Sequence, residues 1–379
     1  MPRRVLASLI VALAAFVTWS SAYANETSAR EAILIDMSTG TVLFQKNADE
    51  PTYPSSMTKM MTMYLVFKKL AEGGLSLDAT LPVSEKAWRM GGSKMFVEVD
   101  TRVVVEDLIR GVVIQSGNDA TIVLAEGISG SEEAFAIDMT DQANEMGMTS
   151  SNFRNASGWP DPEHVTTVRD LATLAIRTIE DFPEYYPYYA ETTFTFSDIE
   201  QSNRNPLLYT ASGADGLKTG HTEAAGYGLT ASAERDGRRL VLVINGVESS
   251  AERAREAERL IEWGFREFDA YALLEAGETV TDAEVWLGDE NTVPLVIEED
   301  LVITMSREAR REMTAKAVFE GPIPAPIVAG SPIATLVLEA PNMETIEVPL
   351  IAGADVGELS MFSRLGAAIS YLVFGPSGS

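Results

Sequence analysis

Residues 53–64 read YPSSMTKMMTMY, and this stretch decides how the rest of the chain is interpreted. Its large side chains recur at the spacing of one helix face, and Gly73-Gly74 ends the pattern, so we predict a buried helix. Ser56 and Lys59 are three residues apart and therefore share a face of that helix. A lysine can remove the proton of a serine nucleophile if burial keeps the amine neutral, and a second cation such as Lys218 would lower its pKa further. Alone, such a pair is more often a helix cap beside a lysine that reaches water.

Two further short strings follow, in an order that suits an acyl-transfer site. Ser116-Gly117-Asn118 separates two predicted helices, over 105–115 and from 118 or 119 to 126, where a loop can aim a hydroxyl and an amide into a cleft. Lys218-Thr219-Gly220 lies in a predicted strand, where the lysine and threonine could hold a carboxylate and the glycine would let an extended substrate approach. Singly, these strings also fit a helix stop with an Asn cap and a lysine-protected edge strand. Together they match the S-x-x-K, S-D-N and K-T-G set of serine acyl-transfer enzymes, with SGN in the middle place.

The patterns around these strings predict an α+β fold in two parts. The β-rich runs 227–233 and 238–244 flank Asp236-Gly237, which is a strong hairpin signal, and 216–219 fits an adjacent strand. Residues 25–275 therefore read as helices packed on an antiparallel sheet. Composition changes near 275–282, and short β-rich runs separated by turns then fill 282–355, which favours a small all-β sandwich.

Both ends of the chain carry patterns related to membranes. Residues 1–24 combine a basic start, the apolar run 5–19 and Ala22-Tyr23-Ala24, so we expect a cleaved signal peptide; the alternative is a membrane anchor, but the run is shorter than the ~20 residues a span needs. Residues 357–374 place large apolar side chains on one helical face, which suits an amphipathic helix lying in a membrane surface. The alternative is a helix that packs on its own domain or on a partner.

Charge and composition exclude several classes of function. The formal net charge is −27, and removal of Arg3 and Arg4 with the signal makes it −29, which disfavours any nucleic-acid partner. The chain has no cysteine and two histidines, too few for a thiolate or His-rich metal site. We therefore expect no metal and no other cofactor.

Five segments of the chain resemble the D-alanyl-D-alanine carboxypeptidases among the low-molecular-mass penicillin-binding proteins. They are residues 53–64, 111–126, 151–171, 215–233 and 263–265. The resemblance covers about 31–268 well and the β-rich tail more loosely, and it implies a β-lactamase/transpeptidase-like fold.

The resemblance also implies the roles of individual residues. Ser56 would be the acylated nucleophile, Lys59 its base, and Ser116 a proton relay between base and leaving group. The substrate-binding residues would be Asn118, Lys218, Thr219, Gly220, His221 and Arg253. The backbone N–H groups of Ser56 and His221 would form an oxyanion hole. Arg255 is the alternative to Arg253 as the residue that holds the terminal carboxylate.

The implied substrate is the stem pentapeptide of peptidoglycan, with β-lactams as covalent inhibitors. The implied location is the periplasm, with attachment to the outer face of the inner membrane through residues 357–374. Three other functions remain open: a class A β-lactamase, although 119–217 holds no clear E-x-x-x-N match; a D,D-endopeptidase that cuts cross-links; and a non-catalytic envelope scaffold.

Overall fold

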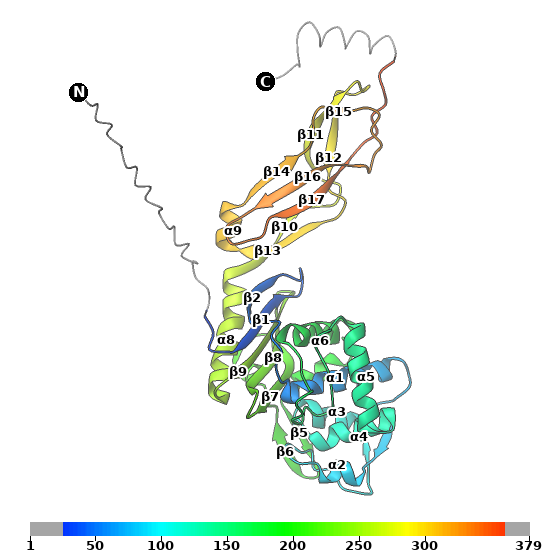
Figure 1. The fold of residues 1–379 in the computed structure, drawn as a ribbon, viewed down its shortest axis with the longest axis vertical. Coiled ribbons are helices and arrows are strands. Elements are labelled where there is room, and N and C mark those ends of the chain that lie inside the picture. Colours follow the sequence, from blue (N-terminus) through cyan, green and yellow to red (C-terminus); the bar gives the residue numbers. More distant parts are fainter. Residues whose placement is uncertain (1–25, 361–379) are drawn as a thin grey trace, which may run out of the picture.

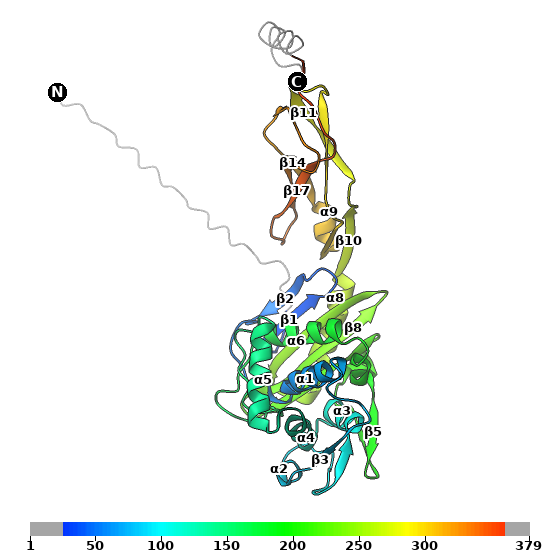
Figure 2. The same ribbon diagram turned by 90° about the vertical axis from the view of Figure 1, so that its right-hand side faces the viewer.

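The computed structural model describes residues 26–360, and it shows two parts placed one after the other along the long axis (Figures 1 and 2). The signal peptide expected over 1–24 and most of the helix expected over 357–374 lie outside the described residues. Within 26–360, no helix is long and apolar enough to cross a membrane.

The first part is built on a five-stranded antiparallel sheet of order β2-β1-β9-β8-β7. The predicted hairpin is confirmed: β8 and β9 join through Asp236 and Gly237, whose φ angles of 51° and 79° are those of a tight primed turn. β7, which carries the Lys-Thr-Gly string, is an edge strand. The strands are β1 (Glu31–Asp36), β2 (Val42–Lys46), β7 (Ala214–Thr222), β8 (Gly226–Arg235) and β9 (Arg238–Val247).

The central strands are buried on both faces because helices cover both sides of the sheet (Figure 2). Along β9, Val243 packs into the core under the helical layer, whereas Leu242 faces the core under α8. This alternation explains why residues 240–244 are continuously apolar. One face is covered by α8 (Ser250–Glu267), and the other by a layer whose principal helices are α1 (Lys59–Ala71), α2 (Glu85–Arg89), α3 (Val105–Val113), α4 (Asn118–Ser129), α5 (Glu132–Glu145) and α6 (Val168–Asp181).

Two short segments place the motif residues at the edge of this layer. Ser56 lies in the 3-10 turn η1 (Ser55–Thr58), which runs directly into α1. Ser116 lies between α3 and α4 in the left-handed region, at a φ of 61°, a conformation that L residues adopt at some cost in energy. The remaining short elements of this part are β3 (Thr80–Pro82), β4 (Arg102–Val104), η2 (Tyr186–Ala190), β5 (Thr193–Phe196), β6 (Ile199–Ser202) and α7 (Leu207–Thr210).

The second part is all-β apart from one short helix, as the sequence predicted. It begins at β10 (Phe268–Leu274), directly after α8, which is earlier in the chain than the expected range 282–355. A two-stranded sheet, β10-β13, and a six-stranded sheet, β14-β16-β17-β12-β11-β15, share one apolar core. The other elements are β11 (Thr279–Trp286), β12 (Thr292–Val296), β13 (Leu301–Ser306), α9 (Arg307–Glu312), β14 (Thr314–Val318), β15 (Ile323–Pro324), β16 (Pro332–Glu339) and β17 (Ile346–Ala352).

A buried polar cluster joins the two parts. Asp36 is fully buried at the end of β1, and its Oδ2 accepts from Arg238 Nε at 2.7 Å and from Thr304 Oγ1 on β13 at 3.1 Å. Arg238 also donates to the Phe268 carbonyl at 2.6 Å, at the start of β10. These contacts tie the β-rich part to the sheet of the first part.

Candidate active site

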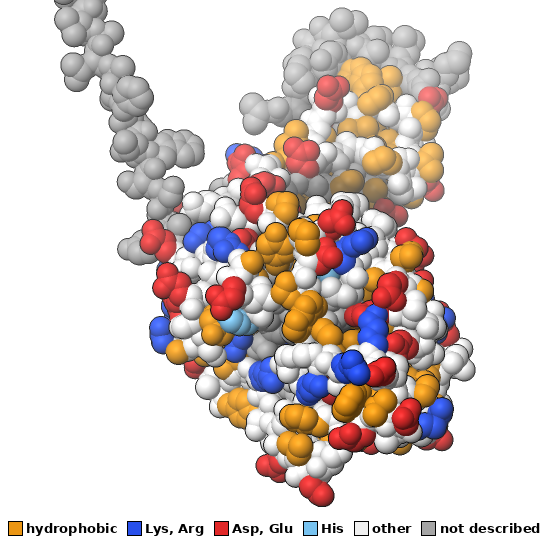
Figure 3. All heavy atoms as spheres, turned by 60° about the horizontal axis from the view of Figure 1, so that its bottom comes forward, with side chains coloured by type: hydrophobic (Ala, Val, Ile, Leu, Met, Phe, Trp, Pro, Cys, Tyr) orange, Lys and Arg blue, Asp and Glu red, His pale blue; other side chains and the backbone are white. Residues whose placement is uncertain are grey.

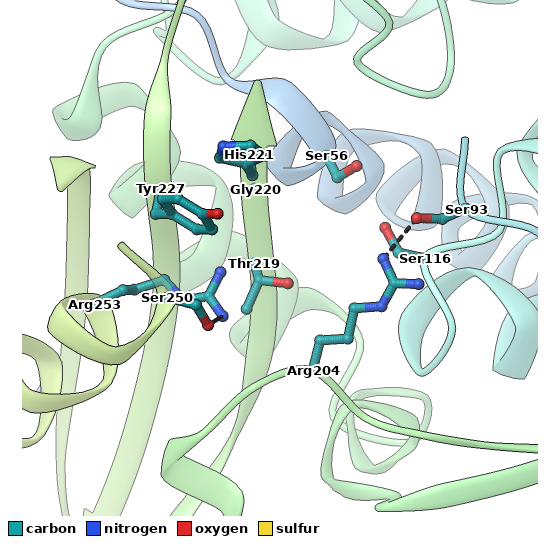
Figure 4. Close-up of a pocket in the computed structure, with 10 residues that line it drawn as sticks. All are labelled: Ser56, Ser93, Ser116, Arg204, Thr219, Gly220, His221, Tyr227, Ser250 and Arg253. Atoms are coloured by element: carbon teal, nitrogen blue, oxygen red, sulfur yellow. Dashed lines mark hydrogen bonds between the residues drawn. The ribbon is translucent and has the colours of Figure 1, made fainter. Parts of the chain in front are cut away.

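The three strings predicted from the sequence meet at one pocket of about 460 Å³ (Figure 4). Ser56 comes from η1, Ser116 from the loop before α4, and Thr219, Gly220 and His221 from β7. α8 adds Ser250 and Arg253, and β8 adds Tyr227. The structure therefore brings together residues that lie up to 197 positions apart, counted from Ser56 to Arg253.

Lys59 lies directly behind the candidate nucleophile. Its Nζ is 3.1 Å from Ser56 Oγ, and its side chain is fully buried. Burial lowers the pKa of Lys59 to about 7, with a smaller lowering from the positive charge of Arg204. Burial acts in this direction because a charged amine loses its hydration.

The partners of Lys59 suit a neutral amine. Lys59 Nζ donates to Asn118 Oδ1 at 2.7 Å and to the Ser157 carbonyl at 2.5 Å. A neutral amine has two N–H donors and one lone pair, so these two acceptors use both donors. In the protonated form the third N–H donates to Ser56 Oγ; in the neutral form the lone pair takes that place and can accept the Ser56 proton, as proton removal requires.

Asn118 and Ser116 have different surroundings. Besides accepting from Lys59, Asn118 donates through Nδ2 to the Gly91 carbonyl at 2.8 Å, so its amide positions the lysine, and Asn118 itself does not line the pocket. Ser116 is 1% exposed and lines the pocket beside Ser93 and Arg204 (Figure 4). The sequence predicted both residues for the site but did not foresee the contact between Asn118 and Lys59.

The Lys-Thr-Gly string of β7 lies alongside the nucleophile turn. Lys218 is 2% exposed, and burial together with the charges of Lys59, Arg204 and Arg253 holds its pKa well below the usual value. Gly220 faces η1: an added Cβ would lie 2.9 Å from the Pro54 carbonyl oxygen and 3.2 Å from Cβ of Ser55. Glycine therefore allows β7 to approach the nucleophile turn closely, a reason that the sequence analysis, which considered only the substrate, did not include.

The structure distinguishes Arg253 from Arg255, which the sequence left as alternatives. Arg253 lines the pocket, is 7% exposed, and stacks its guanidinium 5.8 Å from the centroid of the Tyr227 ring. Burial lowers the pKa of Arg253 to about 10. Arg255 is exposed and does not line the pocket. His221 is exposed, and its ring stacks on Tyr227 with 3.9 Å between centroids.

Five residues at the site were not predicted from the sequence: Ser93, Arg204, Tyr227 and Ser250, which line the pocket, and Ser157, which contacts Lys59. Arg204, from the loop after β6, donates to Ser93 Oγ at 2.6 Å at one end of the pocket (Figure 4). Arg204 is also the cation that lowers the pKa of Lys59, a role that the sequence analysis gave to Lys218. Ser157 contributes only its backbone carbonyl, for which no sequence pattern exists.

The pocket is cationic although the chain is strongly acidic. Lys59, Lys218, Arg204 and Arg253 gather in or behind it, and within the part of the chain that the structure describes no Asp or Glu lines it. Figure 3 shows acidic and basic side chains interspersed over the end of the molecule, without one uniform basic surface. The site therefore suits a small ligand with an anionic group.

Family comparisons agree with this geometry. Residues 18–249 match the D-alanyl-D-alanine carboxypeptidase family, and residues 268–358 match the C-terminal domain of penicillin-binding protein 5. The chain is 37% identical over 346 residues to D-alanyl-D-alanine carboxypeptidase DacA of Haemophilus influenzae, covering 90% of this chain and 88% of the relative. It is 36% identical over 359 residues to DacC of Escherichia coli, covering 93% and 90%.

Solved structures show the same fold. The D-alanyl-D-alanine carboxypeptidase DacD from Francisella tularensis superposes with a TM-score of 0.79 at 30% identity, covering 88% of this chain and 94% of that chain. Penicillin-binding protein 5 from Haemophilus influenzae gives 0.74 at 37% identity, with 88% and 98% covered. The ampicillin-bound penicillin-binding protein D2 from Listeria monocytogenes gives 0.59 at 30% identity, with 64% and 98% covered.

Proposed function

This chain belongs to the penicillin-binding D-alanyl-D-alanine carboxypeptidases, and we propose that Ser56 is its acylated nucleophile and Lys59 the base that activates it. One observation carries the proposal: a fully buried lysine, with a pKa of about 7, lies 3.1 Å from the serine hydroxyl. An ordinary lysine is almost entirely protonated at neutral pH and cannot accept a proton.

The acylation step begins at the penultimate D-alanine of the peptide. Ser56 Oγ bonds to the carbonyl carbon while its proton passes to Lys59 Nζ. Backbone N–H groups of Ser56 and His221 are the proposed donors to the developing oxyanion, and such donors typically contribute about 3 kcal/mol each. The C–N bond to the terminal D-alanine then breaks, and the leaving nitrogen takes the proton through Ser116.

The deacylation step returns the enzyme to its starting state. A water molecule adds its oxygen to the acyl carbon, and its proton passes through Lys59 to Ser56 Oγ as the ester C–O bond breaks. The products are the shortened peptide, with a new carboxylate, and free D-alanine.

The pocket also supports a binding site for the terminal carboxylate of the peptide. Thr219 and Arg253 line the pocket, and Lys218 lies buried next to Thr219. We propose that these groups hold the carboxylate of the leaving D-alanine, with Gly220 in the edge strand beside the substrate backbone and Asn118 facing a substrate amide. A free carboxylate matches the unpaired cationic character of the site.

The substrate that we propose is the stem pentapeptide of peptidoglycan, and β-lactams would acylate the same serine. The Listeria relative holds ampicillin in its solved structure. A class A β-lactamase would need a carboxylate to drive water onto the acyl-enzyme, and no Asp or Glu of residues 26–360 lines the pocket. We therefore favour the carboxypeptidase over the β-lactamase.

The test is release of D-alanine from a stem pentapeptide by the purified protein, with Ser56→Ala as the control. We expect steady release by the wild-type enzyme and none by the variant. Release by Ser56→Ala would overturn the assignment of the nucleophile. Cleavage of cross-linked dimers in preference to the pentapeptide would instead favour the endopeptidase.

We also propose export to the periplasm and attachment to the outer face of the inner membrane through residues 357–374. Glu358 forms a bridge with Gly288, so deletion of residues 361–379 leaves that contact in place. We expect the deletion to abolish binding to lipid vesicles and to leave carboxypeptidase activity unchanged. Undiminished vesicle binding would contradict the anchor.

A further inference from the structure

We propose that Asn155 is a positioning residue for the acylation step: its side-chain amide holds the 155–159 turn so that the Ser157 carbonyl orients the Lys59 amine toward Ser56. The inference rests on the proposed function, because it assumes that Lys59 is the base. Asn155 does not line the pocket, so it would act through Lys59 without touching the substrate.

The side chain of Asn155 makes most of the hydrogen bonds within the turn, and the Ser157 hydroxyl adds two longer ones, from Trp159 N and to Asn155 Oδ1, each at 3.3 Å. Its Oδ1 accepts from the backbone N–H groups of Ser157 at 3.2 Å, Gly158 at 2.8 Å and Trp159 at 2.9 Å. Its Nδ2 donates to the Trp159 carbonyl at 2.9 Å. Asn side chains favour tight turns because they can bond to backbone groups a few residues ahead, and here one amide bonds to three successive residues.

The same turn is pressed against the nucleophile segment. Gly158 has a φ of +80°, and an added Cβ there would lie 1.7 Å from the Ser55 carbonyl oxygen and 2.8 Å from Thr58 Oγ1. His164 Nε2 lies 2.9 Å from Thr58 Oγ1 and joins the far side of the loop to the same segment. The turn is therefore packed directly on η1, and its geometry sets where the Ser157 carbonyl lies.

The Ser157 carbonyl determines the direction of the Lys59 lone pair. Lys59 Nζ donates to Ser157 at 2.5 Å and to Asn118 at 2.7 Å, and these two bonds fix the amine with its lone pair on Ser56. If the carbonyl moves, one N–H is free and the amine can rotate away from the hydroxyl. Misplacement of a reacting group by about 1 Å can lower a rate about 100-fold.

The chain offers a rescue variant and a matched control. Asn155→Ala removes the acceptor. Asn155→Asp keeps an acceptor for the three N–H groups, but it replaces the donor to Trp159 with a carboxylate oxygen that repels the Trp159 carbonyl, and it adds a negative charge. Asn152 lies in the same loop, and its Nδ2 donates to the Glu163 carbonyl at 2.6 Å, so Asn152→Ala removes one amide contact far from Ser157. Asn155→Ser, with a shorter acceptor, replaces Asn155→Ala if thermal unfolding shows that the alanine variant does not fold.

The experiment measures acylation by a fluorescent penicillin in single-turnover mode, at saturating and subsaturating concentrations, at about pH 9, where Lys59 is neutral. We expect Asn155→Ala to slow the acylation rate constant about 10- to 100-fold with an unchanged dissociation constant for the non-covalent complex. We expect Asn155→Asp to lose less than Asn155→Ala, because it still accepts from the three N–H groups, and Asn152→Ala to equal the wild type. If the alanine variant does not fold, Asn155→Ser should show an intermediate loss.

The inference would be overturned if Asn155→Ala, or Asn155→Ser in its place, acylated at the wild-type rate. It would also be overturned if the Ala and Asp variants of Asn155 lost the same rate, or if Asn152→Ala lost as much as Asn155→Ala. A change confined to the dissociation constant would also contradict it, because positioning acts on the chemical step. Failure of the wild-type protein itself to acylate would instead contradict the proposed function, so the two failures are distinguishable.

Discussion

The acylation rate of this enzyme should follow the protonation of Lys59, and the structure sets the expected size of the effect. Burial lowers the pKa of Lys59 from 10.5 to about 7, a difference of about 5 kcal/mol between the two protonation states. At pH 7 about half of the amine is then neutral, compared with about one molecule in 3,000 for an ordinary lysine. The acylation rate should therefore fall as the pH falls, because only the neutral form of Lys59 can accept the proton of Ser56.

Lowering the pH is therefore the perturbation. Below the pKa, the neutral fraction falls about tenfold per pH unit, so acylation at pH 5 should be about 100-fold slower than the plateau above pH 8. The groups that act on this pKa are Arg204, which lowers it, and Asp119 and Glu132, which raise it. The assay is single-turnover labelling with a fluorescent penicillin across the pH range, with circular dichroism to show that the fold persists.

Two results would exclude Lys59 as a base with a pKa near 7. A rate that stays flat from pH 8 to pH 5 would mean that no group with a pKa near 7 controls acylation. A rate that keeps rising through pH 10 would mean that Lys59 titrates as an ordinary solvated lysine. Lys59→Arg serves as the chemical control, because arginine keeps the positive charge and cannot act as a neutral base, and we expect almost no acylation.

Three further predictions concern other parts of the molecule. Arg204→Gln should move the acidic limb of the acylation profile to higher pH, since it removes the cation that lowers the pKa of Lys59; an unmoved limb would leave burial as the only cause. Arg253→Ala should slow turnover of peptides with a free terminal carboxylate more than that of amidated peptides, whereas Arg255→Ala, at an exposed position, should affect neither. Asp36→Ala should lower the free energy of unfolding by about 3 kcal/mol in urea titrations, because it leaves Arg238, whose side chain is only 12% exposed, without its carboxylate; a loss below about 1 kcal/mol would show that water replaces the carboxylate.

Much of the fold could be predicted because its signals are local. The Asp236-Gly237 turn between apolar runs predicts a hairpin, and the continuous apolar run 240–244 predicts a central strand, since both depend only on backbone preference and burial. The start of the β-rich part was less visible: β10 follows α8 without a break or a turn-rich linker, so composition changes only after the strand has begun.

Some residues of the candidate site could also be predicted from local patterns, and others could not. Ser56, Lys59, Ser116 and the residues of β7 carry recognisable spacing, and the structure places them together at one pocket. Arg204 and the Ser157 carbonyl could not be predicted, because they reach the site through long-range contacts: Arg204 through its bond to Ser93, and Ser157 through the packing of the 155–159 turn on η1. Asn155 has an ordinary turn signal in the sequence, and only the folded turn shows what that signal positions.

The most direct test of the central claim is the site of the covalent penicillin adduct. The wild-type protein is incubated with benzylpenicillin, digested, and mapped by mass spectrometry, in parallel with Ser56→Ala. We expect one adduct, on the peptide that contains Ser56, and none in the variant. An adduct on Ser116 or any other residue, or labelling that persists in Ser56→Ala, would contradict that claim.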